Sequence, residues 1–123
     1  MGRSKVKRKV KYIWDATYKF HWMIVFGGHL QEAIDQYAER VKADTWPIED
    51  ENRYGHFGAV RGKSNGFIWF RDTKPKGSII AHEVYHLVMY MFEEMEVKEV
   101  KEEMEEFFAY YTEFIFDKVE SFL

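Results

Sequence analysis

The sequence predicts a single α+β domain, with an antiparallel or mixed sheet of three to five strands, one helix in its first half and a long helical pair at its end. Its 123 residues suit one domain with a modest core. An apolar share of 46% and an aromatic share of 19% are typical of a globular chain rather than a disordered one. Runs of β-type residues and one amphipathic helix fill the first part of the chain, and helical spacing dominates from Ser78 onward.

Two strands and a helix are predicted in the first half. Residues 5–14 alternate loosely between apolar side chains and lysines, and residues 18–26 form a run of strong β propensity. Gly27-Gly28 ends the second strand. The apolar spacing over residues 29–42 then predicts a helix, which the segment leading to Pro47 terminates.

A hairpin and two helices are predicted in the second half. Residues 54–61 and 66–71 read as strands around the turn signal Asn65-Gly66. Ser78 is the expected N-cap of the next helix, and periodicity falters over residues 93–96, where we expect the chain to reverse. The core face of this helix is expected to comprise Ile80, Val84, Leu87, Val88 and Met91. The apolar stripe of the last helix is expected to comprise Val97, Val100, Met104, Phe108, Tyr111, Ile115 and Phe122.

The pentapeptide from His82 to His86 reads H-E-x-x-H inside an apolar run. Residues four apart lie on one face of a helix, so both imidazoles can reach one Zn²⁺. Glu83 then flanks the metal as a general base for a water whose pKa the metal lowers to about 7. The alternative is that all three are satisfied polar groups of a buried helix, although burying them without partners is costly.

A catalytic zinc of this type needs a third ligand, and the acidic segment 101–111 supplies the candidates. Glu106 follows His86 after nineteen residues and begins an E-x-x-A pattern. The chain must reverse between them, because one continuous helix would hold them about 30 Å apart. Tyr110 or Tyr111 is a candidate to stabilise an oxyanion, although an aromatic at helical spacing is more often part of the core. The rivals of Glu106 are Glu102, Glu103, Glu105 and Glu113.

H-E-x-x-H followed by this spaced E-x-x-A resembles the gluzincin metallopeptidases. In its short length the chain is similar to minigluzincins and to small metallopeptidase-like proteins of phage and prophage genomes. The resemblance implies a small zincin-like domain and a hydrolase of the metalloprotease class. It also implies His82, His86 and Glu106 as Zn²⁺ ligands and Glu83 as general base. In gluzincins the strand before the motif helix pairs with an extended substrate, so Phe67–Phe70 is either such a rim or an interior strand packed on that helix.

Charge is distributed unevenly along the chain. Residues 1–14 carry six basic side chains and no acid, whereas residues 93–120 carry eleven acids. We interpret residues 1–11 as a solvated basic arm or the lead into the first strand, which disfavours nucleic acid as a partner. No cysteine, signal peptide or transmembrane run is present, so a cytoplasmic protein that acts on a peptide or protein substrate is expected.

Three other functions remain open on sequence grounds. The same site is suited to another amide, such as a cell-wall crosslink. The chain is also compatible with a zinc-stabilised or catalytically silent interaction module, of the kind a phage encodes, that uses its basic arm. Without metal, the last two helical segments would form one long helix that mediates oligomerisation.

Overall fold

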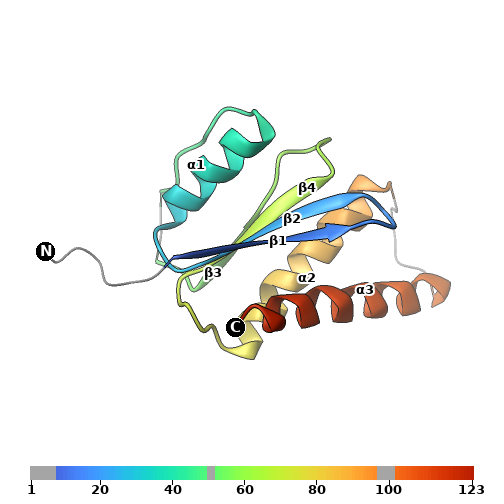
Figure 1. The fold of residues 1–123 in the computed structure, drawn as a ribbon. Coiled ribbons are helices and arrows are strands. Elements are labelled where there is room, and N and C mark those ends of the chain that lie inside the picture. Colours follow the sequence, from blue (N-terminus) through green and yellow to red (C-terminus); the bar gives the residue numbers. More distant parts are fainter. Residues whose placement is uncertain (1–7, 50–51, 97–101) are drawn as a thin grey trace, which may run out of the picture.

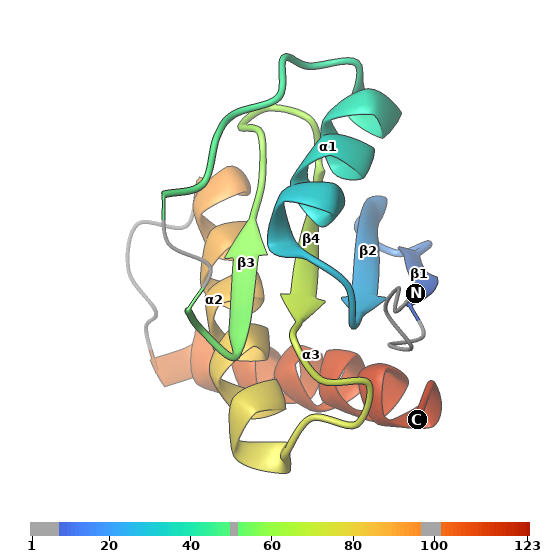
Figure 2. The same cartoon turned by 90° about the vertical axis from the view of Figure 1, so that its left-hand side faces the viewer.

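The computed structural model describes residues 8–49, 52–96 and 102–123, and these form a small α+β domain. A four-stranded mixed sheet in the order β1-β2-β4-β3 lies at its centre. Helix α1 covers one face of the sheet, and α2 and α3 lie together on the other (Figures 1 and 2). The elements are β1 (Lys9–Asp15), β2 (Phe20–Phe26), α1 (Leu30–Val41), β3 (Gly55–Gly58), β4 (Asn65–Phe70), α2 (Gly77–Glu94) and α3 (Glu102–Ser121).

Strands β1 and β2, which are both predicted from the sequence, form an antiparallel hairpin. Asp15 closes it, because its carboxylate accepts the backbone N–H groups of Thr17 and Tyr18 at 3.0 Å each. Lys19 completes the turn with a φ of 63°. Residues 5–7 of the predicted first strand lie outside the described residues.

Helix α1 connects β2 to the second half of the sheet, and its bounds agree with the prediction. The Glu32 carboxylate accepts the N–H of His29 at 2.9 Å, which satisfies one backbone donor at the helix start. The helix ends at Val41, and Lys42 takes a left-handed conformation with a φ of 58°.

Strand β4 is interior, since it pairs in parallel with β2 on one side and antiparallel with β3 on the other. Of the two expectations for Phe67–Phe70, the interior strand is therefore confirmed and the substrate-pairing rim is wrong. The apolar run of β4 agrees with this position, because strands inside a sheet that is covered on both faces are near-continuous in apolar residues. The edge next to α2 is instead β3 (Figure 2).

The N-cap of α2 is Lys76, so the expectation of Ser78 is wrong. The Lys76 carbonyl accepts the N–H groups of Ile79 and Ile80, and the helix therefore starts at Gly77. The predicted core face is confirmed, since its five members are fully buried: Ile80, Val84, Leu87, Val88 and Met91.

The chain leaves the helical conformation after Glu94, where a reversal is predicted. Met95 caps α2, and Glu96 has a φ of 62°. α3 then packs on the same face of the sheet as α2 (Figure 1), so the alternative of one long helix is wrong. In the predicted stripe of α3, Tyr111 and Ile115 are buried, while Val97 and Val100 lie outside the described residues. Val119, which the prediction omits, is also buried.

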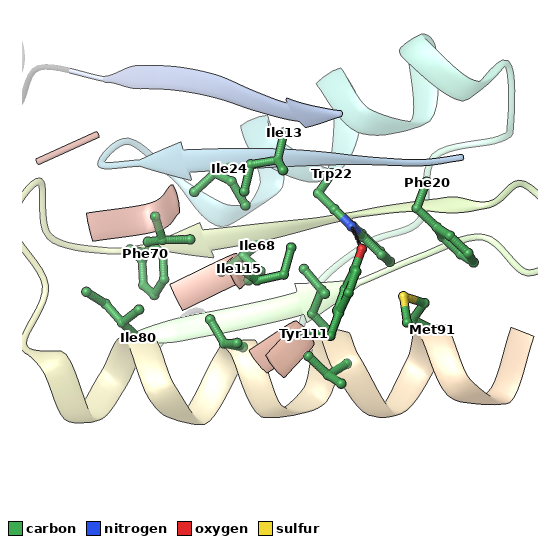
Figure 3. Packing of buried hydrophobic residues seen from close by; sticks show 14 of the residues in the cluster. Ile13, Phe20, Trp22, Ile24, Ile68, Phe70, Ile80, Met91, Tyr111 and Ile115 are labelled. Carbon is green, nitrogen blue, oxygen red and sulfur yellow. Dashed lines mark hydrogen bonds between the residues drawn. The ribbon is translucent and has the colours of Figure 1, made fainter. Parts of the chain in front are cut away.

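The core between the sheet and α2/α3 contains one buried polar network. Trp22 donates its indole N–H to the Tyr111 hydroxyl at 3.0 Å, and Tyr111 donates to Asp15 at 2.8 Å. Figure 3 shows Trp22 and Tyr111 meeting among aliphatic side chains. This network fixes α3 against the β1–β2 hairpin. In the described part of the chain, no helix is long and apolar enough to cross a membrane.

Candidate functional site

The two motif histidines lie side by side on the exposed face of α2. Their Nε2 atoms are 3.2 Å apart, and both side chains are open to solvent. Two imidazole nitrogens that share one tetrahedral zinc at 2.0–2.1 Å are separated by about 3.3 Å. The pair therefore has the spacing that a common metal ion requires.

Glu83, between them in sequence, is buried, with 6% of its surface exposed. Its carboxyl group lies between α2 and Gly55 of β3, and the absence of a side chain on Gly55 makes this space available. Burial raises the pKa of Glu83, while electrostatic interaction with His82 and Arg53 lowers it in part. A buried carboxyl group with a raised pKa is suited to proton transfer.

Arg53 and His56 border the same site from the β3 side. Arg53 Nη1 lies 2.9 Å from His56 Nδ1, and because a guanidinium only donates, Nδ1 is the acceptor. Burial, followed by the charges of Arg53 and His86, lowers the pKa of His56 to about 4. His56 is therefore neutral near pH 7, with its proton on Nε2.

Local spacing in the sequence does not single out His56, because no ligand-type side chain lies four residues away from it. The pairing of β3 with β4 and the packing of β3 on α2 place it near His86, and neither is visible in local spacing. The only sequence signal was that residues 54–61 form a strand shortly before the motif helix.

The outer side of β3 presents backbone groups to solvent. Arg71 donates its N–H to the Tyr54 carbonyl at 3.0 Å, so Tyr54 belongs to a hydrogen-bonded pair with β4. Such pairs alternate along antiparallel strands, so the N–H and C=O groups of Gly55 and Phe57 point away from β4. No other strand of the described chain pairs with this edge.

Glu106 and Tyr110 lie on the exposed side of α3, and Tyr110 is 64% exposed. Within the described residues, no three His, Cys, Asp or Glu side chains are grouped closely enough to hold a metal. The structure thus brings His82 and His86 together without a third ligand beside them, and Glu106 in that role stays a prediction. Its rivals Glu105 and Glu113 are also exposed, and the side chains of Glu102 and Glu103 are not among those described.

Tyr111, the other candidate for oxyanion stabilisation, is in the core. Its hydroxyl already donates to Asp15 and accepts from Trp22, and burial raises its pKa well above the usual range. It is therefore a structural residue rather than a group available to a substrate.

Exposed apolar side chains surround the histidine pair. Tyr85 is 51% exposed and Met89 is 39% exposed, although both belong to the otherwise packed helix α2. The Tyr85 ring lies 6.0 Å from the His86 ring and 6.0 Å from the Phe108 ring of α3. An apolar surface next to the candidate metal position is suited to a side chain of a bound substrate.

Comparison of the chain with protein-family models, with curated proteins and with solved structures found no match. The elements of the candidate site are the His82–His86 pair, the buried Glu83 and the open edge of β3.

Proposed function

We propose that this protein is a zinc-dependent peptidase that hydrolyses peptide bonds with Glu83 as its general base. The observation that carries the proposal is the 3.2 Å separation of the His82 and His86 Nε2 atoms, on the helix that also carries the buried carboxyl group of Glu83. A hydrogen-bonded imidazole pair alone would not require the buried Glu83. A metallohydrolase uses all three residues.

The donor set fits zinc. Two imidazoles at ligand spacing supply half of a tetrahedral shell, and their exposure leaves room for a protein carboxylate and a substrate. We propose Glu106 as the third ligand. The contact between Phe108 and Tyr85 supports this, because it brings the first half of α3 against the helix that carries the histidines.

The metal supplies Lewis acidity, which polarises a carbonyl and makes a water easier to deprotonate. Glu83 accepts the proton of the attacking water and returns it to the leaving amine. The raised pKa of Glu83 suits both steps, because the carboxyl group holds the proton for longer than an exposed glutamate does. Tyr110 is proposed to donate its O–H to the oxyanion that develops on the substrate.

The substrate is proposed to be an extended peptide or protein segment that pairs with the outer side of β3. The outward N–H and C=O groups of Gly55 and Phe57 support this alignment, since strand addition satisfies them. A peptide in this position runs along α2, so one of its side chains meets Tyr85 or Met89. We therefore expect a preference for an apolar residue near the scissile bond.

The test combines metal content and turnover. Protein purified without added metal is examined by mass spectrometry and by cleavage of an unstructured protein substrate, alongside His86→Ala, Glu83→Gln and the control His21→Ala. We expect about one zinc per chain in wild type, Glu83→Gln and His21→Ala, and a strong loss in His86→Ala. Cleavage is expected in wild type and His21→Ala only.

Three outcomes contradict the proposal in different ways. Absence of zinc from wild-type protein after equilibration with the metal eliminates the metal site. One zinc without cleavage of any peptide substrate favours an interaction module or another amide substrate. Cleavage that persists in Glu83→Gln removes Glu83 from the role of base.

A further inference from the structure

A cavity of about 250 Å³ lies on the face of the sheet that α1 covers, opposite the face that carries α2 and the histidine pair. The strand register places its polar lining on this face. Trp14, His21 and Asn65 are neighbours across β1, β2 and β4. They share the α1 face because His21 is two residues from Met23, which packs in the core under α1. Helix α1 ends at Val41. The cavity, which His21 and Asn65 help to line, opens where the helix stops.

The polar groups that line this cavity are mainly hydrogen-bond donors, and none of the described lining residues is acidic. Arg40 contributes a guanidinium, which only donates. The Asn65 side-chain oxygen accepts the Tyr37 hydroxyl proton, which leaves the amide NH₂ of Asn65 to donate. Such a lining favours an anion.

The rest of the wall is apolar. Met23 and Val41 contribute aliphatic surface, and Tyr37 contributes its ring. At the rim, the Trp14 and His21 rings lie 4.3 Å apart, and the Arg40 guanidinium carbon lies 4.2 Å from the centre of the Tyr12 ring. An apolar wall with an aromatic rim accommodates the body of a ligand whose charged end meets Arg40.

The volume limits the size of that body. A closed apolar cavity of about 150 Å³ holds benzene, whereas pockets for drug-sized ligands begin near 300 Å³. At about 250 Å³ this cavity suits one ring with a short charged substituent.

We propose that this cavity is a binding site for a small aromatic carboxylate. The carboxylate pairs with the planar fork of Arg40 and accepts from Asn65, and the ring lies against Met23, Val41 and Tyr37. The proposal does not depend on the histidine site, because the lining residues lie on the other face of the sheet. It holds whether or not the protein is a peptidase.

The test is an NMR titration of the full chain at low salt with benzoate, benzamide and inorganic phosphate as separate probes. We expect saturable binding of benzoate with a dissociation constant of roughly 0.1–1 mM, with shifts centred on His21, Asn65 and Arg40. Benzamide, which lacks the charge, and phosphate, which lacks the ring, are expected to bind at least about 10-fold more weakly.

Two arginine variants make the test specific. Arg40→Gln is expected to weaken benzoate binding by about 10-fold or more. Arg71→Gln is the matched control, because Arg71 also lies over an exposed tyrosine ring, at 4.0 Å from Tyr54, but away from this cavity. Arg40 is exposed and Arg71 is only partly buried, so neither change is expected to impair folding.

Several results would overturn the proposal. These are no saturable benzoate binding at millimolar concentration, equal loss in both arginine variants, or equal binding of benzamide. Phosphate binding as tight as benzoate would make the cavity a general anion site and remove the aromatic ligand. As a second variant, Val41→Trp fills the cavity from the last turn of α1 and is expected to abolish benzoate shifts at His21.

Discussion

Gly55 of the edge strand lies so close to Glu83 that a Cβ atom at position 55 would stand 2.9 Å from Glu83 Cγ and 3.1 Å from Oε2. The strand proposed to align the substrate therefore also sets the position of the proposed base. A side chain at position 55 would displace either the carboxyl group or the strand. Both changes alter the distance between base and substrate.

Gly55→Ala is predicted to lower kcat by about 10- to 100-fold, because misplacing a catalytic group by about 1 Å costs this much. Zinc content is predicted to stay at the wild-type level, since the atoms nearest to a Cβ at position 55 belong to Glu83 and not to His82 or His86. Steady-state kinetics and metal analysis of the same preparation check both statements.

Two glycine variants separate this effect from general destabilisation. A Cβ at Gly58 would stand 2.6 Å from the Phe67 ring, so Gly58→Ala should reduce stability without touching Glu83. A Cβ at Gly77 meets nothing within 4 Å, so Gly77→Ala should change little. An equal loss of kcat in Gly55→Ala and Gly58→Ala, at temperatures where both are folded, would contradict the positional role of Gly55.

Tyr111→Phe is predicted to lower the free energy of unfolding by about 1–3 kcal/mol, because Asp15 and Trp22 each lose a buried partner. Zinc binding should be unchanged. Tyr110→Phe is the neighbouring control, and with 64% of Tyr110 exposed it should change the free energy of unfolding by less than about 0.5 kcal/mol. Urea unfolding measures the free energy of unfolding of both variants.

Tyr110→Phe also tests the proposed role of Tyr110 in catalysis. If Tyr110 stabilises the oxyanion, this variant should lower kcat by about 10-fold or more while stability is kept.

Features with a local cause were predictable from the sequence. The spacing of Ile80, Val84 and Met91 depends only on the helical repeat, and their burial agrees with it. The reversal after Glu94 follows from the loss of that repeat. The order of strands does not, because pairing of β2 with β4 depends on long-range packing that β propensity does not encode.

In the candidate site, too, only the features with a local cause were predictable. His82 and His86 come together because they are about one helical turn apart, and the sequence spacing predicts this directly. Gly55, Arg53 and His56 reach Glu83 and His86 through the packing of β3 on α2, and no spacing rule connects them. For the same reason Glu106 could be nominated by resemblance but not placed in space.

Acid is predicted to reduce stability through His56. Its pKa is lowered from 6.5 to about 4 in the folded protein, so below pH 6.5 the unfolded chain binds a proton that the folded chain does not. This contribution to stability is complete above pH 6.5, decreases as the pH falls towards about 4, and then stays constant. Urea unfolding at a series of pH values between these limits measures the loss, with chelator present to remove metal competition.

Two variants assign that loss. Gln at position 56 does not titrate, so His56→Gln should lack the part of the acid loss that His56 causes. As the pH falls, the free energy of unfolding of wild type should therefore decrease more than that of His56→Gln. Arg53→Gln removes the second cause of the lowered His56 pKa, so this pKa should move back towards 6.5. The acid-dependent loss of stability should therefore be smaller than in wild type. A wild-type loss that is identical in His56→Gln would assign the acid sensitivity to the carboxyl groups instead.

Removing the proposed third ligand should weaken the metal site without unfolding the protein. Glu106 is exposed on α3, so Glu106→Ala is predicted to leave the free energy of unfolding of the metal-free protein nearly unchanged. Its zinc dissociation constant should rise at least about 100-fold, because losing even an outer-shell partner costs 10- to 100-fold. Competition with a chelating dye measures this directly. Glu120→Ala is the matched control, since Glu120 is also exposed, lies about four turns further along the same side of α3 and is not a candidate ligand. A similar loss in Glu105→Ala, with none in Glu106→Ala, would move the ligand to the neighbouring glutamate and would show that α3 turns a different face to the histidines when it binds metal.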